Sequence, residues 1–496
     1  MKININKSII WVILLTMTAC HKLEYLPADQ LDISQVAGSP EGLQSILNGV
    51  YARLKQRNYV RHRVVMQEYP SDQEVWVKNS GDHSQQIYSY QCTVNNSVAS
   101  QFWKQAYYGI YEANVLIAAI KDDAAKEQLQ IKGEALFLRA LMHYDLVRAF
   151  SRPYSQDPEK NLGVMIRDNT DVNALPPRST VKDTYAFIEG DLLKAAELMT
   201  VHKPSIYASR ETARALLARL YLYMGENDKA IQYADMVINS GQYHLLETEA
   251  FGAYFTQLPE SNPETIFAIK LTENENMGKT AIGSLYTSDG GGWGEIMASP
   301  TYLRLIYKNK NDERIKFLNP VYVHDQSGQK IPSATEPSGY EVEKRDGYSK
   351  YYIEKYSNEG GIPLLSSPIV IRLAEMYLIK AEAYAKLGQD EDALDMVNLI
   401  RKRAGLSGDQ LYTAGDLKGY PTVLDAVLGE RNLELAWEGH RSFDLFRNGR
   451  SLDRSYVPAV GWSGPRGLIP PDARSIVIPI PEDEIALNPN LVQNPL

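Results

Sequence analysis

Apolar residues recur at helical spacing along most of this chain. Over residues 42–55 they fall three and four positions apart, so one face of the segment is apolar and the other polar, as in an amphipathic helix. The same spacing extends over residues 100–120 and 127–150, and Pro153 ends the last of these segments. The pattern therefore predicts a mostly α-helical protein.

A repeated motif predicts how these helices are arranged. Four positions recur with a constant displacement of 163 residues, so that Ala218, Tyr221, Gly225 and Ala230 correspond to Ala381, Tyr384, Gly388 and Ala393. In a tetratricopeptide helix pair, small residues lie where the two helices touch, and glycine occupies the turn between them. The repeat therefore predicts two such helix pairs.

Other helices extend the series. The helix over residues 127–150 and the later helix over residues 183–199 are predicted to form a degenerate third pair, and residues 423–447 form a last helical unit. Because each pair buries its apolar face only against its neighbours, the units are expected to stack into one tetratricopeptide-like scaffold. This scaffold is expected to comprise residues of about 41–57, 100–240 and 366–447.

Two stretches, residues 60–99 and 249–365, lack this helical period. The second contains clustered glycines at 290–294, many tyrosines, and short β-like runs at 265–270 and 321–324. A segment of that length is too long to be a single loop in a compact domain. We therefore expect an irregular, loop-rich insert that packs on the scaffold and forms the ligand-binding region.

The N-terminal residues have the pattern of an export signal. Lys2 and Lys7 precede an apolar run at residues 9–15, and small residues lie directly before Cys20. The run is too short to span a bilayer, which requires roughly 20 apolar residues. With a cysteine at the junction, the segment resembles a bacterial lipobox.

The lipobox-like junction predicts the organisation of the mature protein. Residues 1–19 are expected to be a signal peptide, residues 20–40 a lipidated tether, and residues 41–496 a single domain. Two or more acyl chains on Cys20 would give stable membrane anchoring, for which one chain is marginal.

Charge and motifs argue against several classes of function. The formal net charge of −9 disfavours nucleic-acid binding, which depends on basic side chains. The chain has no His-Glu-x-x-His, Gly-x-Ser-x-Gly or P-loop motif. Glu430, Glu434 and Glu438 fall on one helical face near Arg431 and Arg441, and we interpret them as an ion-pair network and not as a metal site. We therefore predict no metal, no cofactor and no catalysis.

Hydrolysis of a glycoside is the enzymatic alternative. That chemistry needs only two suitably spaced carboxyl groups, and Glu68, Asp72 and Glu74 lie close together in the sequence. Nothing in the sequence sets the distance between them, so this alternative lacks a mechanism.

Several short segments, in order along the chain, resemble proteins of the SusD/RagB family. Besides the lipobox they are GVYARL at 49–54, ALFLRA at 135–140, RLAEMYL at 372–378, NLIRKRAG at 398–405, ER at 430–431, EGHR at 438–441, IPIP at 478–481 and QNP at 493–495. The resemblance implies a lipoprotein on the outer face of the outer membrane of a Bacteroidetes-type bacterium. It also implies that the protein delivers oligosaccharides to a SusC-type TonB-dependent transporter. Some relatives take peptides, which is the main alternative ligand.

Aromatic side chains indicate where a sugar would bind. Tyrosine outnumbers phenylalanine by 32 to 10, and rings with a polar edge suit the apolar faces and hydroxyl rims of sugars. Trp103 and Trp437 lie on helical stripes and are predicted to be core residues, whereas Trp76 and Trp293 lie in the irregular stretches. The remaining candidates for ligand contact are Tyr88, Tyr90, Tyr286, Asp289, Tyr340 and Tyr348.

The anchor can be tested directly. We expect Cys20→Ala to remove the protein from the membrane fraction, because the acyl chains would have no attachment site. Fractionation of cells followed by immunoblotting measures this. Unchanged membrane retention of the variant would refute the lipobox interpretation.

Overall fold

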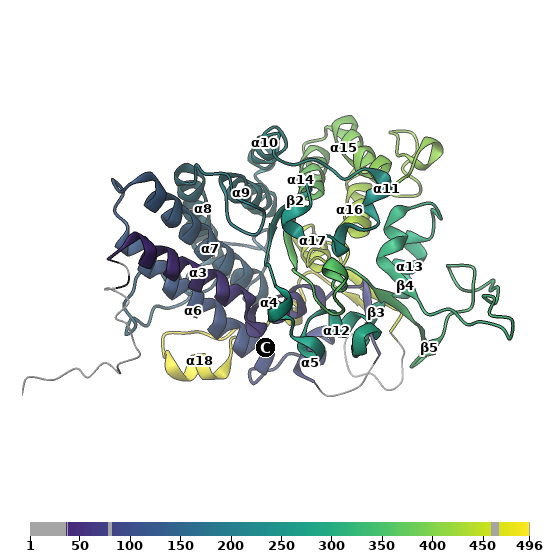
Figure 1. The fold of residues 1–496 in the computed structure, drawn as a ribbon, viewed down its shortest axis with the longest axis horizontal. Coiled ribbons are helices and arrows are strands. Elements are labelled where there is room, and N and C mark those ends of the chain that lie inside the picture. Colours follow the sequence, from purple (N-terminus) through teal and green to yellow (C-terminus); the bar gives the residue numbers. More distant parts are fainter. Residues whose placement is uncertain (1–35, 37, 78–81, 458–465, 496) are drawn as a thin grey trace, which may run out of the picture.

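The computed structural model describes residues 36, 38–77, 82–457 and 466–495. Helices dominate these residues, as predicted (Figure 1). The predicted signal peptide, Cys20 and most of the predicted tether lie outside the described residues. Within the described part of the chain, no helix has both the length and the apolar content needed to cross a bilayer.

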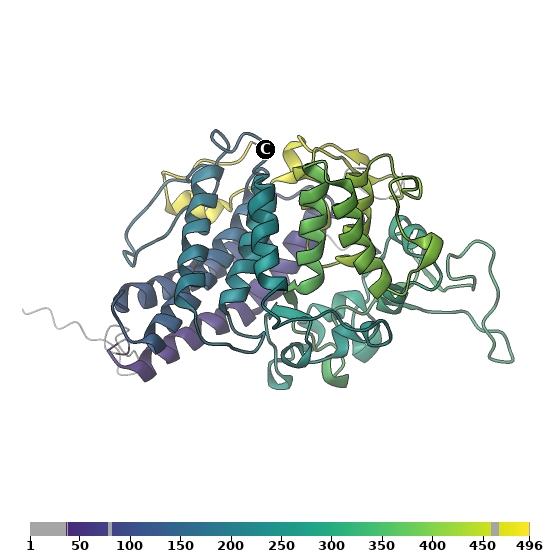
Figure 2. The ribbon, with the colours of Figure 1, turned by 90° about the horizontal axis from the view of Figure 1, so that it is seen from above.

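The scaffold is a row of helices that pack largely in sequence order. From α6 to α10 each helix packs against the next, α10 packs against α14, and the row continues through α15 to α16. Figure 2 shows many of these helices side by side. The scaffold helices are α3 (Pro40–Lys55), α4 (Arg57–Glu68), α6 (Ser97–Ala119), α7 (Lys126–Phe150), α8 (Val181–Leu198), α9 (Arg210–Met224), α10 (Asn227–Ile238), α14 (Leu373–Lys386), α15 (Asp390–Arg403) and α16 (Val423–Glu434).

The repeat appears in the structure as the two helix pairs α9–α10 and α14–α15. Helix α9 begins with a capping box between Ser209 and Thr212 and ends at Gly225, whose φ of 81° is in the left-handed region that favours glycine. Gly388 has the same role between α14 and α15, with φ of 74°. The four repeated alanines are fully buried at the helix contacts: Ala218, Ala230, Ala381 and Ala393. The predicted tetratricopeptide-like arrangement is confirmed.

The insert and the remaining segments contain short elements. The strands of these segments form the antiparallel pairs β1–β3, β2–β8, β4–β7, β5–β6 and β9–β10. The short helices are α5 (His83–Tyr88), α11 (Thr248–Phe251), α12 (Gly283–Tyr286), α13 (Pro300–Ile306), α17 (Arg441–Arg447) and α18 (Glu482–Leu487). The strands are β1 (Glu74–Trp76), β2 (Thr265–Ala268), β3 (Ile296–Ala298), β4 (Leu318–Pro320), β5 (Lys344–Arg345), β6 (Tyr348–Ser349), β7 (Tyr351–Ile353), β8 (Ile369–Arg372), β9 (Leu452–Arg454) and β10 (Gly467–Ile469).

The structure corrects two predicted boundaries. The stretch predicted to be irregular from residue 60 begins with helix α4, in which Val60 and Val64 lie one turn apart and are both buried. The unit predicted over residues 423–447 is two helices, because the chain turns sharply at Trp437, where φ is 64°. Trp103 and Trp437 are both fully buried, which confirms that they are core residues.

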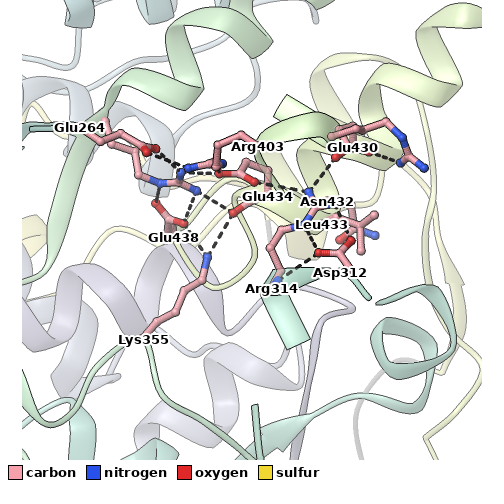
Figure 3. Close-up of polar contacts among 12 residues, drawn as sticks. Glu264, Asp312, Arg314, Lys355, Arg403, Glu430, Asn432, Leu433, Glu434 and Glu438 are labelled. Carbon is pink, nitrogen blue, oxygen red and sulfur yellow. Dashed lines mark hydrogen bonds and ion pairs between the residues drawn. The ribbon is translucent and has the colours of Figure 1, made fainter. Parts of the chain in front are cut away.

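Buried ion pairs join the insert to the scaffold. Glu434, near the end of α16, contacts Arg372 (2.5 Å), Arg314 (3.4 Å) and Arg403. Burial raises the pKa of Glu434, but the three guanidinium groups outweigh that effect and hold its pKa well below the ordinary range. Figure 3 shows Arg314 approaching Glu434 from the insert and Arg403 approaching it from the scaffold.

The same network includes Glu430, one turn earlier on α16, and Glu438, which lies beyond the end of that helix. Glu430 pairs with Arg314 at 2.7 Å and with Arg401 at 2.6 Å. Glu438 pairs with Arg372 at 2.8 Å and with Lys355 at 2.7 Å. The predicted ion-pair network is therefore confirmed.

The predicted partners of these glutamates, however, were wrong. Arg431 pairs with Asp444 and Arg441 pairs with Asp72, each at 2.8 Å or less. The actual partners come from elements distant in the sequence, so neighbours along the helix did not reveal them.

The network predicts a large loss of stability in Glu434→Ala. The substitution leaves three buried guanidinium groups short of one carboxylate, which we expect to lower the free energy of unfolding by about 3–5 kcal/mol. Urea denaturation followed by circular dichroism measures this change. Glu197→Ala is the control, because the Glu197 side chain is 66% exposed and pairs with Lys194 on the same helix. Equal effects of the two substitutions would contradict the role assigned to Glu434.

Candidate functional site

The glycine-rich loop between α12 and β3 is folded tightly against its surroundings. Gly290 and Gly294 have φ of 61° and 52°, in the region that favours glycine. A Cβ atom at Gly294 would lie 2.7 Å from the ring of Tyr352, and one at Gly292 would lie 2.1 Å from the carbonyl oxygen of Thr287. The glycines therefore allow the close packing that holds this loop in place.

Trp293 lies in the loop, and the residue is 48% exposed. Its indole Nε1 donates a hydrogen bond to the carbonyl oxygen of Lys279 at 3.1 Å, and its backbone N–H donates to the carbonyl oxygen of Ser284 at 2.6 Å. Arg345 donates hydrogen bonds of 3.0 Å to the carbonyl oxygens of Trp293 and Gly294. These bonds fix the orientation of a ring that solvent can still reach.

Charged and amide groups lie beside this ring and at the start of its loop. The ammonium group of Lys279 lies 5.3 Å from the ring centroid of Trp293. Asp289, in the same loop, is exposed and accepts a hydrogen bond of 3.4 Å from Asn319, which also donates to Glu354 at 3.0 Å. An accessible aromatic face beside hydrogen-bonding groups can hold a ligand that is apolar on its faces and hydroxylated at its edge.

The sequence identified only part of this site. Trp293 and Asp289 lie in it, as proposed from the sequence. Lys279, Asn319 and Arg345 were missed, because they come from three other segments of the insert. The glycine cluster was the available signal, since it marks a loop that packs closely against other backbone.

Tyr340 belongs to the segment between β4 and β5, which extends to the right in Figure 1 as a long excursion of the insert. Its ring is 40% exposed and lies edge-on to Tyr322, with 5.8 Å between centroids. The ammonium group of Lys330 lies 3.7 Å from the centroid of the Tyr322 ring and 5.5 Å from that of Tyr340. Tyr340 thus belongs to a cluster on this excursion. Tyr348 lies nearer its base and is half-buried.

The structure corrects the expected exposure of four other candidates, which are buried: Trp76, Tyr88, Tyr90 and Tyr286. Trp76 belongs to β1, which pairs with β3, and its ring packs edge-on to Tyr69 at 5.6 Å. Tyr286 stacks on Tyr356 at 5.0 Å. Trp76 also packs against Tyr88, and Tyr286 against Tyr69, whereas Tyr90 packs in a separate cluster with Leu445 and Phe446. These rings therefore belong to the core of the fold.

The carboxyl groups that suggested hydrolysis are enclosed as well. Glu68 and Glu74 are fully buried, and Asp72 pairs with Arg441. Glu68 accepts a hydrogen bond of 2.8 Å from the backbone N–H of Gly439. Burial raises the pKa of Glu68 to about 7, and burial together with the charge of Glu68 raises the pKa of Glu74 well above its ordinary value. Neither group is in contact with solvent, where a saccharide would bind.

Comparison with known proteins agrees with this architecture. The SusD family profile matches residues 263–496, and a second profile, described as starch-binding associating with outer membrane, matches residues 23–222. A SusD superfamily protein from Bacteroides thetaiotaomicron is 28% identical, with a TM-score of 0.80 over 92% of this chain and 100% of that one. Another from Bacteroides vulgatus is 29% identical, with a TM-score of 0.78 over 92% and 99%.

A similar relationship extends over nearly the full sequence. SusD-like protein P2 of Formosa agariphila is 26% identical over 510 aligned residues, covering 97% of both chains. The fold is thus that of a helical, tetratricopeptide-like protein with an irregular insert. The chain belongs to the SusD/RagB family.

The buried glutamates predict a pH-dependent effect of Glu68→Gln. In the folded protein the pKa of Glu68 is raised to about 7, whereas in the unfolded chain it lies near 4.3. The wild type therefore loses stability as pH rises through this interval, and the neutral glutamine does not. We expect the stability of the variant relative to the wild type to increase by about 1–3 kcal/mol between pH 5 and pH 8.

Urea denaturation at several pH values measures the difference in unfolding free energy between the variant and the wild type. Titrating groups that both proteins share contribute almost equally to the two free energies, so their contributions largely cancel. Glu197→Gln, at an exposed position, should leave the difference constant. A difference for Glu68→Gln that is equally flat would show that Glu68 is not held neutral in the folded protein.

Proposed function

We propose that this protein captures oligosaccharides at the Trp293 loop and releases them chemically unchanged. The observation that carries this proposal is the half-exposed indole of Trp293, held in place by Lys279, Ser284 and Arg345. A fixed ring loses little conformational freedom on binding, so most of the stacking energy contributes to affinity. Asp289 and Lys279 are placed to exchange hydrogen bonds with sugar hydroxyls.

Family membership supports a saccharide as the ligand. One of the two matching profiles is described as starch-binding associating with outer membrane. The enclosure of Glu68 and Glu74 supports binding over hydrolysis, because an acid and a base must both reach the glycosidic oxygen or the sugar carbon.

The cellular role that we propose follows from the N-terminal sequence and the family. Lipidation of Cys20 would hold the protein on the outer face of the outer membrane. There it would pass captured oligosaccharide to a SusC-like TonB-dependent transporter. Copurification of such a transporter with the lipidated protein would support this role, and its consistent absence from purified membrane complexes would oppose it.

Binding should depend on Trp293. An open platform of this kind is expected to bind with a Kd of roughly 1 μM to 1 mM. Trp293→Ala removes the stacking surface and should weaken binding by about 1–3 kcal/mol without large loss of stability, because the ring is half exposed. Isothermal titration calorimetry against a panel of neutral oligosaccharides measures this.

The matched control is Tyr108→Ala, because Tyr108 is an aromatic residue on the scaffold helix α6 and is 57% exposed. Equal affinity of wild type and Trp293→Ala would place the site elsewhere. Binding of peptides with no binding of sugars would overturn the glycan assignment. Cleavage of the sugar during the titration, abolished by Asp289→Asn, would overturn the assignment of a binding protein.

A further inference from the structure

A cleft lies between α13, α16 and α17, apart from the Trp293 loop. Its volume is about 620 Å³, which is within the range of small-molecule sites. Figure 1 shows α13 and α16 on the side of the molecule away from α3 and α6. Helices α13 and α16 contact each other, and residues of both line the cleft.

The lining of the cleft is cationic, although the protein as a whole has a net charge of −9. Its charged lining residues are Arg304, Lys308, Arg441, Arg450 and Asp425. Arg450 pairs with Asp425 at 2.9 Å, and Arg441 pairs with Asp72 at 2.8 Å. Two of the four cations therefore remain without a carboxylate partner within the described part of the chain.

These two cations are Arg304 and Lys308, on and just after α13. Both are exposed, and within the described chain neither has an acidic side chain at ion-pair distance. Arg304 donates only a hydrogen bond of 3.3 Å to the hydroxyl of Thr301. An anionic group that entered the cleft would not have to displace a carboxylate from either of them.

An aromatic wall faces these cations. Tyr420 lines the cleft and rests on α16 at Gly429. A Cβ atom at position 429 would lie only 2.2 Å from the Tyr420 hydroxyl group, so this packing requires glycine there. Tyr412 packs edge-on to Tyr420, with 6.1 Å between centroids. The ring is thus held from two sides.

The cleft also contains a fixed hydrogen-bond donor. Asn432 lines it and is 8% exposed. Its Oδ1 accepts a hydrogen bond of 2.6 Å from Gln73, which fixes the amide so that Nδ2 is the atom left to donate. An aromatic wall, an oriented amide and two uncompensated cations are the groups that would recognise a sugar bearing an acidic substituent.

We infer that this cleft is a second saccharide site, selective for oligosaccharides that carry carboxylate or sulfate groups. The inference rests on the proposed saccharide-binding function and extends it to a class of substrate. Tyr420 stacks against a sugar ring, Asn432 donates to a hydroxyl or ring oxygen, and Arg304 and Lys308 bind the acidic group.

Calorimetry on the full chain tests this with a short oligogalacturonate, its neutral methyl ester, a sulfated galactan oligosaccharide and an oligoglutamate peptide. We expect the oligogalacturonate or the sulfated sugar to bind, the methyl ester to bind much more weakly, and affinity to fall as salt rises. Whether the oligogalacturonate or the sulfated sugar binds shows whether the cleft selects a carboxylate or a sulfate group. The double variant Arg304→Gln/Lys308→Gln should weaken this binding about tenfold.

Two control variants test whether the binding depends on this cleft. Lys121→Gln/Lys126→Gln removes the same charge from exposed positions just before and at the start of α7 and should leave binding unchanged. In the Trp293→Ala background the acidic sugar should still bind, and Arg304→Gln/Lys308→Gln should still weaken that binding about tenfold, so failure of the proposed function at the Trp293 loop can be told apart from failure of this inference. Equal binding of the methyl ester, equal loss in the Lys121/Lys126 variant, or binding of the peptide alone would each overturn the inference.

Discussion

Arginine side chains in the interior of this protein need carboxylates beside them, and the arrangement of scaffold and insert depends on that requirement. Isolating one such charge from water costs several kcal/mol unless a partner compensates it. Glu264 and Lys355 of the insert find their partners in Arg372, Arg403 and Glu438, at 3.1, 2.7 and 2.7 Å. The insert therefore cannot leave the scaffold without exposing unpaired charge on both sides.

The scaffold could be predicted because its signals are local. Helical spacing, the glycine turns at Gly225 and Gly388, and the buried alanines of the repeat all act within one or two turns of the chain. The fold of the insert has no such local basis. Its strands are two to four residues long and, apart from the β5–β6 hairpin, they pair with strands distant in the sequence, as β4 does with β7. The partners of Glu430 and Glu434 were missed for the same reason.

The candidate site illustrates the same limit. Trp76 and Trp293 both lie in stretches without helical period, yet Trp76 is 3% exposed and Trp293 is 48% exposed. The difference arises because Trp76 lies in a paired strand under Tyr69 and Tyr88, whereas Trp293 lies in a loop that folds back on α12. Exposure is thus decided by tertiary contacts that the composition of a loop does not encode.

The contact between α10 and α14 has a consequence for how the chain folds. These helices are neighbours in the row, but the whole insert lies between Ile238 and Leu373 in the sequence. Bringing them together closes a very long loop of chain. The chain loses conformational entropy on closing that loop before the contact between the two helices can stabilise the fold. Helices α6 to α10 contact one another in sequence order and can assemble without waiting for that closure. The second half of the row is then expected to dock late, on a surface that the first half already presents.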